Sequence, residues 1–141
     1  MNRPDKKNKT LKTAVKALIF CGFFVMAGFL AIPEAHAEAN YIYSGSNDDT
    51  VRKIDSSGNE VWTFDGHTAS VYGVAVDSDG YVYSASFDET VRKIDSSGNE
   101  VWTFDGHTDN VFDVAVDSDG YVYSSSHDRT VRKIDSSGNE V

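Results

Sequence analysis

A forty-residue unit is repeated along this chain of 141 residues. Residues 51–90 and 91–130 are almost the same sequence, a partial copy begins at Tyr41, and a shortened copy runs from Val131 to Val141. A fixed period of this length is typical of folds in which one small structural unit stacks on the next. The chain must therefore fold into equivalent units that lie side by side.

Each unit contains four short runs rich in β-branched and aromatic residues, with Gly, Asp, Asn and Ser between them. In one copy these runs are residues 71–76, 81–86, 90–95 and 100–104. Four short antiparallel strands in forty residues match one blade of a β-propeller. A β-sandwich is the alternative, but it does not normally repeat its sequence at intervals of one sheet. We predict an all-β partial β-propeller with about 2.6 four-stranded antiparallel blades.

The first 37 residues lie outside the repeat and have the pattern of a secretory signal peptide. Six basic residues come first, followed by an uncharged apolar run at 17–32 and the small-residue pattern Ala35-His36-Ala37. This order predicts a signal peptide at residues 1–37, cleaved after Ala37. An uncleaved membrane anchor is the alternative, although the apolar run is shorter than the ~20 residues of a spanning helix. We expect a secreted, periplasmic or cell-surface protein with no membrane association after cleavage.

The chain after residue 37 is strongly acidic. It contains 7 Lys and Arg against 20 Asp and Glu, a net charge of −13. Such a surface repels phosphate backbones, so nucleic acid is not an expected partner. The single cysteine, Cys21, falls in the predicted signal peptide. The exported chain is therefore expected to depend on packing and strand pairing for its stability, without disulfides.

The repeat divides the predicted exported chain into three units. They are a partial blade at 38–64, a full blade at 65–104 and a truncated blade at 105–141. Propellers close with about four to eight blades. The sequence stops at Val141, just before the position of the Trp in the other copies. This ending favours a truncated product of a longer repeat array, and assembly of several copies into one ring is the alternative.

Part of each unit resembles a WD40 repeat, because Gly66-His67-Thr68 is followed by Asp88 before Thr90. In that family the His, a Ser or Thr of the second strand, the Asp and a Trp form a buried hydrogen-bond network. The resemblance implies two structural networks, one of His67, Asp88 and Ser84 or Ser86, and one of His107, Asp128 and Ser124 or Ser126. Ile94-Asp95 stands where the family has Trp-Asp, so the indole donor is missing.

Another part resembles the blades of quinoprotein-like (PQQ-type) propellers. The matching residues are Asp79-Gly80-Tyr81-Val82-Tyr83, with Ile94-Asp95 and Trp102 further along. In that family the blade Trp packs between neighbouring sheets, which the resemblance implies for Trp62 and Trp102, with ligand stacking as the alternative. Both resemblances imply a propeller, and the choice of lineage stays open. A quinone cofactor needs a complete ring of blades, so we expect no cofactor.

No residues have the pattern of a catalytic or metal site. Each candidate His or carboxylate recurs with the blade, whereas an active site needs different groups that converge on one place. His67 and His107 have no second His or Cys at ligand spacing, so we expect structural roles. Asp77-x-Asp79-Gly80 resembles the start of a calcium loop, but Tyr81 and Val82 occupy its fifth and sixth places. A β-turn capped by Asp, without metal, is therefore predicted.

The two full copies differ at seven positions in two zones, the entry to the first strand and the end of the second strand with its turn. The differences are Ala69/Asp109, Ser70/Asn110, Tyr72/Phe112, Gly73/Asp113, Ala85/Ser125, Phe87/His127 and Glu89/Arg129. On a propeller blade both zones open on the same face. Binding loops vary on a scaffold that stays constant, so this face is a candidate binding site. Simple tolerance of change in exposed turns is the alternative.

The predicted ligand-binding residues are Asn47, Asp49, Ser70, Tyr72, Phe87, Glu89, Asn110, Phe112, Asp113, His127 and Arg129. The favoured function is a non-catalytic binding or scaffold module for a protein or peptide ligand, not an enzyme. A homo-oligomer that completes the propeller ring is a second expected partner. The alternatives are a fragment of a quinoprotein-like propeller enzyme and a truncated repeat product without independent function.

Overall fold

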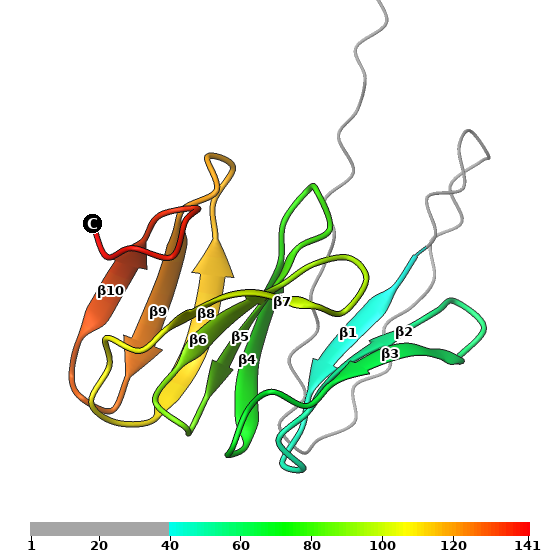
Figure 1. The fold of residues 1–141 in the computed structure, drawn as a ribbon, viewed down its shortest axis with the longest axis horizontal. Coiled ribbons are helices and arrows are strands. Elements are labelled where there is room, and N and C mark those ends of the chain that lie inside the picture. Colours follow the sequence, from blue (N-terminus) through cyan, green and yellow to red (C-terminus); the bar gives the residue numbers. More distant parts are fainter. Residues whose placement is uncertain (1–39) are drawn as a thin grey trace, which may run out of the picture.

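The computed structural model describes residues 40–141 as three antiparallel sheets in chain order (Figure 1). The first sheet contains β1 (Ile42–Gly45), β2 (Val51–Ile54) and β3 (Glu60–Phe64). The second contains β4 (Val71–Val76), β5 (Val82–Ser86), β6 (Val91–Ile94) and β7 (Glu100–Phe104). The third contains β8 (Val111–Val116), β9 (Val122–Ser126) and β10 (Val131–Ile134). The predicted all-β partial propeller is confirmed.

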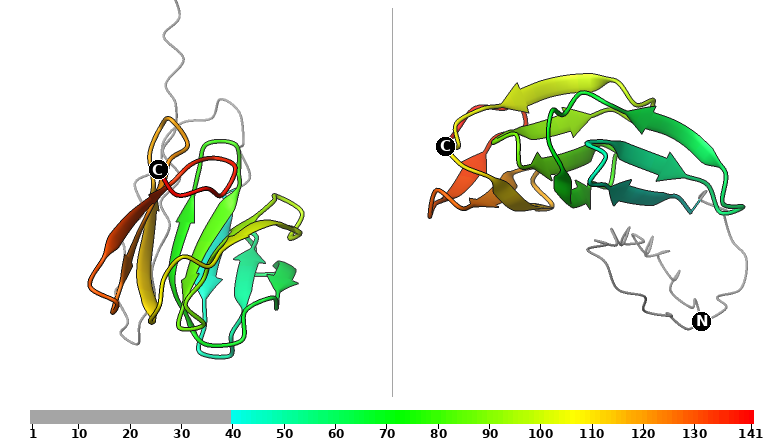
Figure 2. Two further views of the ribbon diagram at one scale, coloured as in Figure 1. Left: turned by 60° about the vertical axis from the view of Figure 1, so that its left-hand side comes forward. Right: turned by 90° about the horizontal axis from the view of Figure 1, so that it is seen from below.

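The sheets lie beside one another along an arc, as blades do in a propeller (Figure 2). Strands within each sheet pair in sequence order, from β4 to β7 in the complete second sheet. The predicted signal peptide and its cleavage site lie outside the described residues. Residues 40–141 contain no helix that is long and apolar enough to cross a membrane.

One edge of the blades consists of turns that are identical between the copies, at residues 55–59, 77–81, 95–99, 117–121 and 135–139. We call it the constant edge. Its turns have an Asp whose side chain binds the backbone ahead of it: Asp77 Oδ1 accepts from the N–H groups of Asp79 and Tyr81, both at 2.9 Å. Gly80 has φ +85°, a conformation that favours glycine. Asp77 thus acts as the predicted turn cap.

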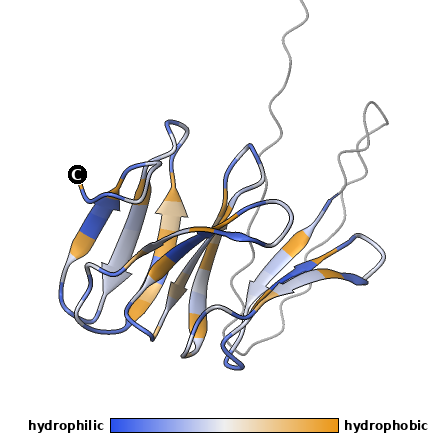
Figure 3. Ribbon diagram, in the orientation of Figure 1, coloured by the Kyte–Doolittle hydropathy of each residue, from blue (hydrophilic) through white to orange (hydrophobic). Residues whose placement is uncertain are grey.

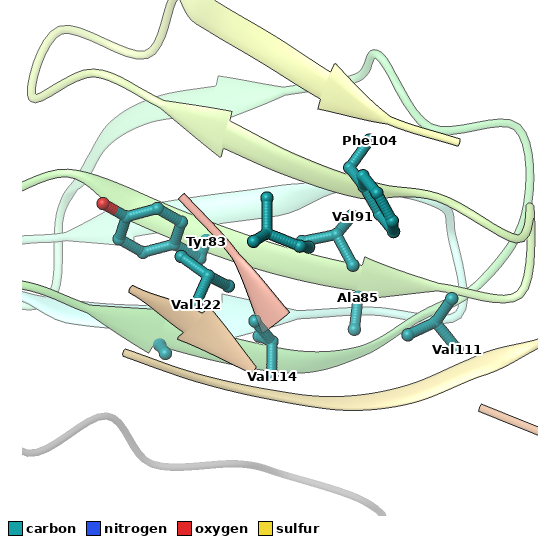
Figure 4. Packing of buried hydrophobic residues seen from close by; sticks show 9 residues of the cluster. Tyr83, Ala85, Val91, Phe104, Val111, Val114 and Val122 are labelled. Carbon is teal, nitrogen blue, oxygen red and sulfur yellow. The ribbon is translucent and has the colours of Figure 1, made fainter. Parts of the chain in front are cut away.

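Apolar residues concentrate in the strands and polar residues in the turns (Figure 3). The buried apolar side chains form two clusters between neighbouring sheets. Figure 4 shows the contact of the second and third sheets, formed by Tyr83, Ala85, Val91, Phe104, Val111, Val114 and Val122. A second cluster, which includes Tyr43, Val51, Phe64, Val71, Val82 and Ile94, joins the first and second sheets. Each sheet therefore depends on its neighbour for burial of its apolar side chains.

Tryptophan links each blade to the next one. The indole N–H of Trp62 donates to the carbonyl oxygen of Ser96 at 3.1 Å, and Trp102 makes the equivalent bond to Ser136 at 3.1 Å. Both acceptors belong to the constant edge of the following blade. The two tryptophans thus pack between neighbouring sheets, as the resemblance to quinoprotein-like propellers implies.

Two of the seven differences between the copies lie in the contact between blades. A Cβ atom on Gly73 would lie 2.8 Å from the Cα of Asp113 in the next blade, so the close approach of β4 and β8 requires glycine. Asp113, the counterpart of Gly73, is exposed on the far side of the third sheet. Ala85 is fully buried between blades. Packing, rather than binding, accounts for Gly73 and Ala85.

The far side of the third sheet is uncovered in residues 40–141. Val131 is 72% exposed, while its counterpart Val91 in the second sheet is fully buried. Asp113, Ala115, Tyr123 and Val131 line a hollow there. The third sheet thus exposes on this side the kind of apolar surface that the second sheet buries against its neighbour.

Substitution of Gly73 tests the blade contact. We expect Gly73→Ala to lower the free energy of unfolding by about 1–3 kcal/mol, because the added methyl group overpacks the approach to β8. Ser125→Ala, in the hollow on the uncovered side of the third sheet, is the matched control and should change stability by less than about 1 kcal/mol. Urea denaturation of the full chain measures both. Equal effects of the two substitutions would show that blade spacing does not depend on Gly73.

Candidate binding site

A buried hydrogen-bond network supports the edge of the blade opposite the constant edge. His67 Nδ1 pairs with Asp88 Oδ2 at 2.8 Å, and His67 Nε2 pairs with Ser84 Oγ at 2.8 Å. In the next blade His107 makes the same contacts with Asp128 (2.7 Å) and Ser124 (2.8 Å). Each network ties the loop before the first strand of a blade to the turn after its second strand.

The second serine of each blade has a different role from the first. Ser86 Oγ donates to the carbonyl oxygen of Ala69 at 2.8 Å and accepts from the N–H of Asp88 at 3.1 Å. Within residues 40–141 no buried side-chain nitrogen or oxygen lacks a hydrogen-bond partner. The network is therefore satisfied with Ile94 in place of a tryptophan, and the missing indole donor leaves no gap.

The carboxylate of Asp88 is the centre of this network. It also accepts from the hydroxyl of Thr90 at 2.6 Å and from the N–H of Thr68 at 3.1 Å. Burial opposes ionisation of Asp88, but the hydrogen bonds from His67 and Thr90 outweigh it and hold the pKa well below its usual range. The pKa of Asp128 is lowered by the same balance.

Above this network lies the variable edge, which we define as the turns at 46–50, 86–90 and 126–130 with the segments at 65–72 and 105–112. In the pairing of β4 with β5, Val71 faces Ser86 and Gly73 faces Ala85, so Tyr72 is the extra residue of a β-bulge. Phe112 has the same place in β8. Bulges redirect side chains and are frequent next to functional sites.

The redirected rings form a row with two further rings from the turns. Tyr72 stacks on Phe87 with ring centres 4.0 Å apart and planes within 2°. Phe87 meets Phe112 of the next blade edge to face at 5.4 Å, and Phe112 meets His127 in the same way at 6.0 Å. We call Tyr72, Phe87, Phe112 and His127 the ring row. It crosses from one blade to the next.

The end of the ring row is accessible to solvent and carries a charged partner. Phe112 is 42% exposed, and the side chain of His127 is 69% exposed. His127 Nδ1 lies 2.9 Å from Asp109 Oδ2. Asp109 was not among the predicted ligand-binding residues. A sequence signal for it exists, because Ala69 and Phe87 in one copy are replaced together by Asp109 and His127 in the other.

The turns of the variable edge hold non-glycine residues in the left-handed backbone region. The φ angles are +69° at Asp49, +69° at Glu89 and +71° at Arg129. The constant edge has glycine at the corresponding place, as at Gly80. A non-glycine residue in this region costs of order 1–3 kcal/mol, and such residues cluster at functional sites. Two carboxylates and one guanidinium group are thus kept where glycine would fold most easily.

The structure brings most of the predicted ligand-binding residues to one edge. The N–H groups of Phe87 and His127 donate to the carbonyl oxygens of Ser70 and Asn110, both at 2.9 Å. Glu89 and Arg129 lie in the same turns as these rings, and Asn47 and Asp49 occupy the equivalent turn of the first sheet. Asp113 is the exception, because it lines the hollow on the uncovered side of the third sheet.

A protein-family model of the PQQ_2 type, described as outer membrane protein assembly factor BamB, matches residues 47–141. The chain belongs to this family. Of the two resemblances seen in the sequence, the match supports the quinoprotein-type propeller. The hydrogen bonds of His67 and His107 are the part that resembles WD40 repeats.

A solved structure titled "Structure of U3-55K" resembles this BamB-type chain in fold. The TM-score is 0.68 at 27% sequence identity, over 72% of this chain and 34% of the other. The BamB-type chain thus spans about a third of the length of that neighbour. A comparison with curated proteins gives no match.

Acid should weaken this BamB-type fold through its network carboxylates. Because the pKa of Asp88 is lower in the folded chain than its unfolded value of about 3.9, its ionised form stabilises the fold above that pH. This stabilisation is lost as the pH falls below about 4. We expect Asp88→Asn to be less stable near neutral pH and to lose less stability on acidification. Urea denaturation midpoints across the acid range measure this, with Asp79→Asn as control. Parallel curves for Asp88→Asn and the unmodified chain would contradict the assignment.

Glycine should relieve the strained turn at Glu89. We expect Glu89→Gly to raise the free energy of unfolding by up to about 1 kcal/mol, since removal of the left-handed penalty exceeds the entropy that glycine adds to the unfolded chain. Glu89→Ala removes the same charge, keeps the strain and should bring no gain. Urea denaturation distinguishes the two. Equal stabilities of the Gly and Ala variants would show that the turn stores no strain.

Proposed function

We propose that this chain is an exported, non-catalytic propeller module that binds a protein or peptide along its variable edge. One observation carries the proposal. Four rings, all at positions where the copies differ, form one continuous row across two blades, on a hydrogen-bonded scaffold that is identical in both. Exposed turns that merely tolerate change would not require their side chains to stack on one another.

The shape and chemistry of the ring row suit an extended polypeptide. Aromatic side chains supply large contact areas at low entropic cost and are enriched at protein interfaces. The row crosses the boundary between two blades through the contact of Phe87 with Phe112. A ligand that follows it meets side chains specific to each blade, so that specificity comes from the order of the blades.

The polar groups of the variable edge support binding better than catalysis. His127 pairs with Asp109, but the described residues place no serine, threonine or cysteine nucleophile in hydrogen bond with His127. The buried histidines are already satisfied by the network. An enzyme fragment remains the second candidate, through kinship with quinoprotein-type propellers alone.

The family description supports a cell-envelope location. It refers to an outer membrane protein assembly factor, and residues 1–37 have the order of an export signal. We therefore place the proposed binding function outside the cytoplasm, in the periplasm, at the cell surface or in the medium.

A swap between blades tests the function without a change in composition or net charge. The variant carries Phe87→His, Glu89→Arg, His127→Phe and Arg129→Glu. Peptides from a displayed random library are selected on the unmodified full chain, and their affinities are compared by fluorescence anisotropy. We expect the swapped chain to bind them at least tenfold more weakly, because the order of side chains along the edge is changed.

The matched control carries Ser78→Ala and Ser118→Ala in the constant edge and should keep full affinity. Circular dichroism melting curves must show that the swapped chain folds. Equal binding of the selected peptides to the unmodified and the swapped chain, both folded, would overturn the proposed function.

A further inference from the structure

We infer that the occupant of the ring row is a basic peptide segment, whose Lys or Arg side chains lie against the rings and their neighbouring carboxylates. This inference rests on the proposed function and names the chemical class of its partner. Three features of the variable edge carry it: its charge, the exposed ring of Phe112, and the placement of Glu89 and Asp109.

Most charged side chains of the variable edge are negative. Arg129 is its only Lys or Arg, and its carboxylates are Asp48, Asp49, Asp65, Asp88, Glu89, Asp105, Asp109 and Asp128. Asp48 pairs with Arg52 of β2, and Asp109 pairs with His127. Asp88 and Asp128 are used by the buried network. Asp49 and Glu89 form no ion pair within residues 40–141. Their charge is thus available to a partner.

The scaffold of this chain already uses lysine against aromatic rings. Lys93 Nζ lies 4.2 Å from the centre of the Tyr81 ring, and Lys133 Nζ lies 3.6 Å from the centre of the Tyr121 ring. Within residues 40–141 no Lys or Arg lies over a ring of the ring row. Phe112 therefore offers an exposed ring of the kind that attracts cations.

Two carboxylates flank the ring row in sequence. Glu89 follows Phe87 in the same turn, and Asp109 precedes Phe112 in the adjoining loop and contacts His127. A cation on the ring row would meet both the aromatic surface and these charges. An acidic segment would meet repulsion, and a neutral apolar segment would leave the charges without partners. Charge complementarity therefore favours the basic segment.

The test uses the peptides that bind the unmodified chain and lose affinity for the swapped chain. We expect them to be enriched in Lys and Arg relative to the starting library. Resynthesis with Gln in place of every Lys and Arg should weaken their binding at least tenfold. The double variant Glu89→Gln with Asp109→Asn should bind the original peptides at least tenfold more weakly.

A matched variant separates local recognition from the general negative charge of the chain. Asp79→Asn with Asp119→Asn removes the same charge from the constant edge and should change affinity less than twofold. An equal loss in both double variants would overturn the inference, because attraction would then come from net charge alone.

The remaining outcomes distinguish failure of the basic-segment inference from failure of the proposed binding function. Swap-sensitive peptides whose Gln versions bind equally well would overturn the basic-segment inference and leave the proposed binding function in place. If no peptide distinguishes the unmodified chain from the folded swapped chain, both are overturned.

Discussion

The packing of one sheet against the next is the constraint on which the rest of this structure depends. A single sheet of four short strands cannot bury its apolar side chains alone, so Val91 and Tyr83 become buried only where the following blade covers them. The repeat supplies that cover, since each blade presents the same surface to its neighbour. Trp62 and Trp102 add one hydrogen bond per contact. The stability of each blade therefore depends on the neighbouring blade that covers it.

The buried His–Asp–Ser network holds the segments of the variable edge in place on the packed blades. It fixes the loop before β4 and the turn after β5 through His67 and Asp88, so the side chains carried by these segments have defined positions. Tyr72 can then leave the pattern of β4 in a bulge and stack on Phe87. The turn also keeps Glu89 in a conformation that glycine would adopt more easily. A constant scaffold makes a variable surface compatible with folding.

The fold follows from the sequence more fully than the site does. The period, the strand runs and the turn residues predict the blades, because each depends on local chemistry. A difference between the copies, in contrast, can have more than one structural cause. Gly73 and Ala85 differ from their counterparts because of packing between blades, whereas Phe87 and His127 differ on the variable edge. The sequence alone does not show which difference is due to packing, because that depends on the position of the neighbouring blade. The bulge at Tyr72 is a backbone irregularity that the alternation of apolar and polar residues does not reveal.

The variable edge and the constant edge are both acidic, so charge alone does not distinguish them. On the constant edge Asp77 accepts hydrogen bonds from the backbone of its own turn and from Tyr83, and these bonds satisfy the carboxylate within the blade. On the variable edge Glu89 lies in the same turn as Phe87 of the ring row and has no ion-pair partner within residues 40–141. A carboxylate already satisfied by its own fold gains little from a partner, whereas a cation that binds an unpaired carboxylate near an aromatic ring gains both a charge contact and a ring contact. Asp77 and Glu89 therefore differ in how their charges are already used, and this difference supports our proposal of recognition at the edge that carries the ring row.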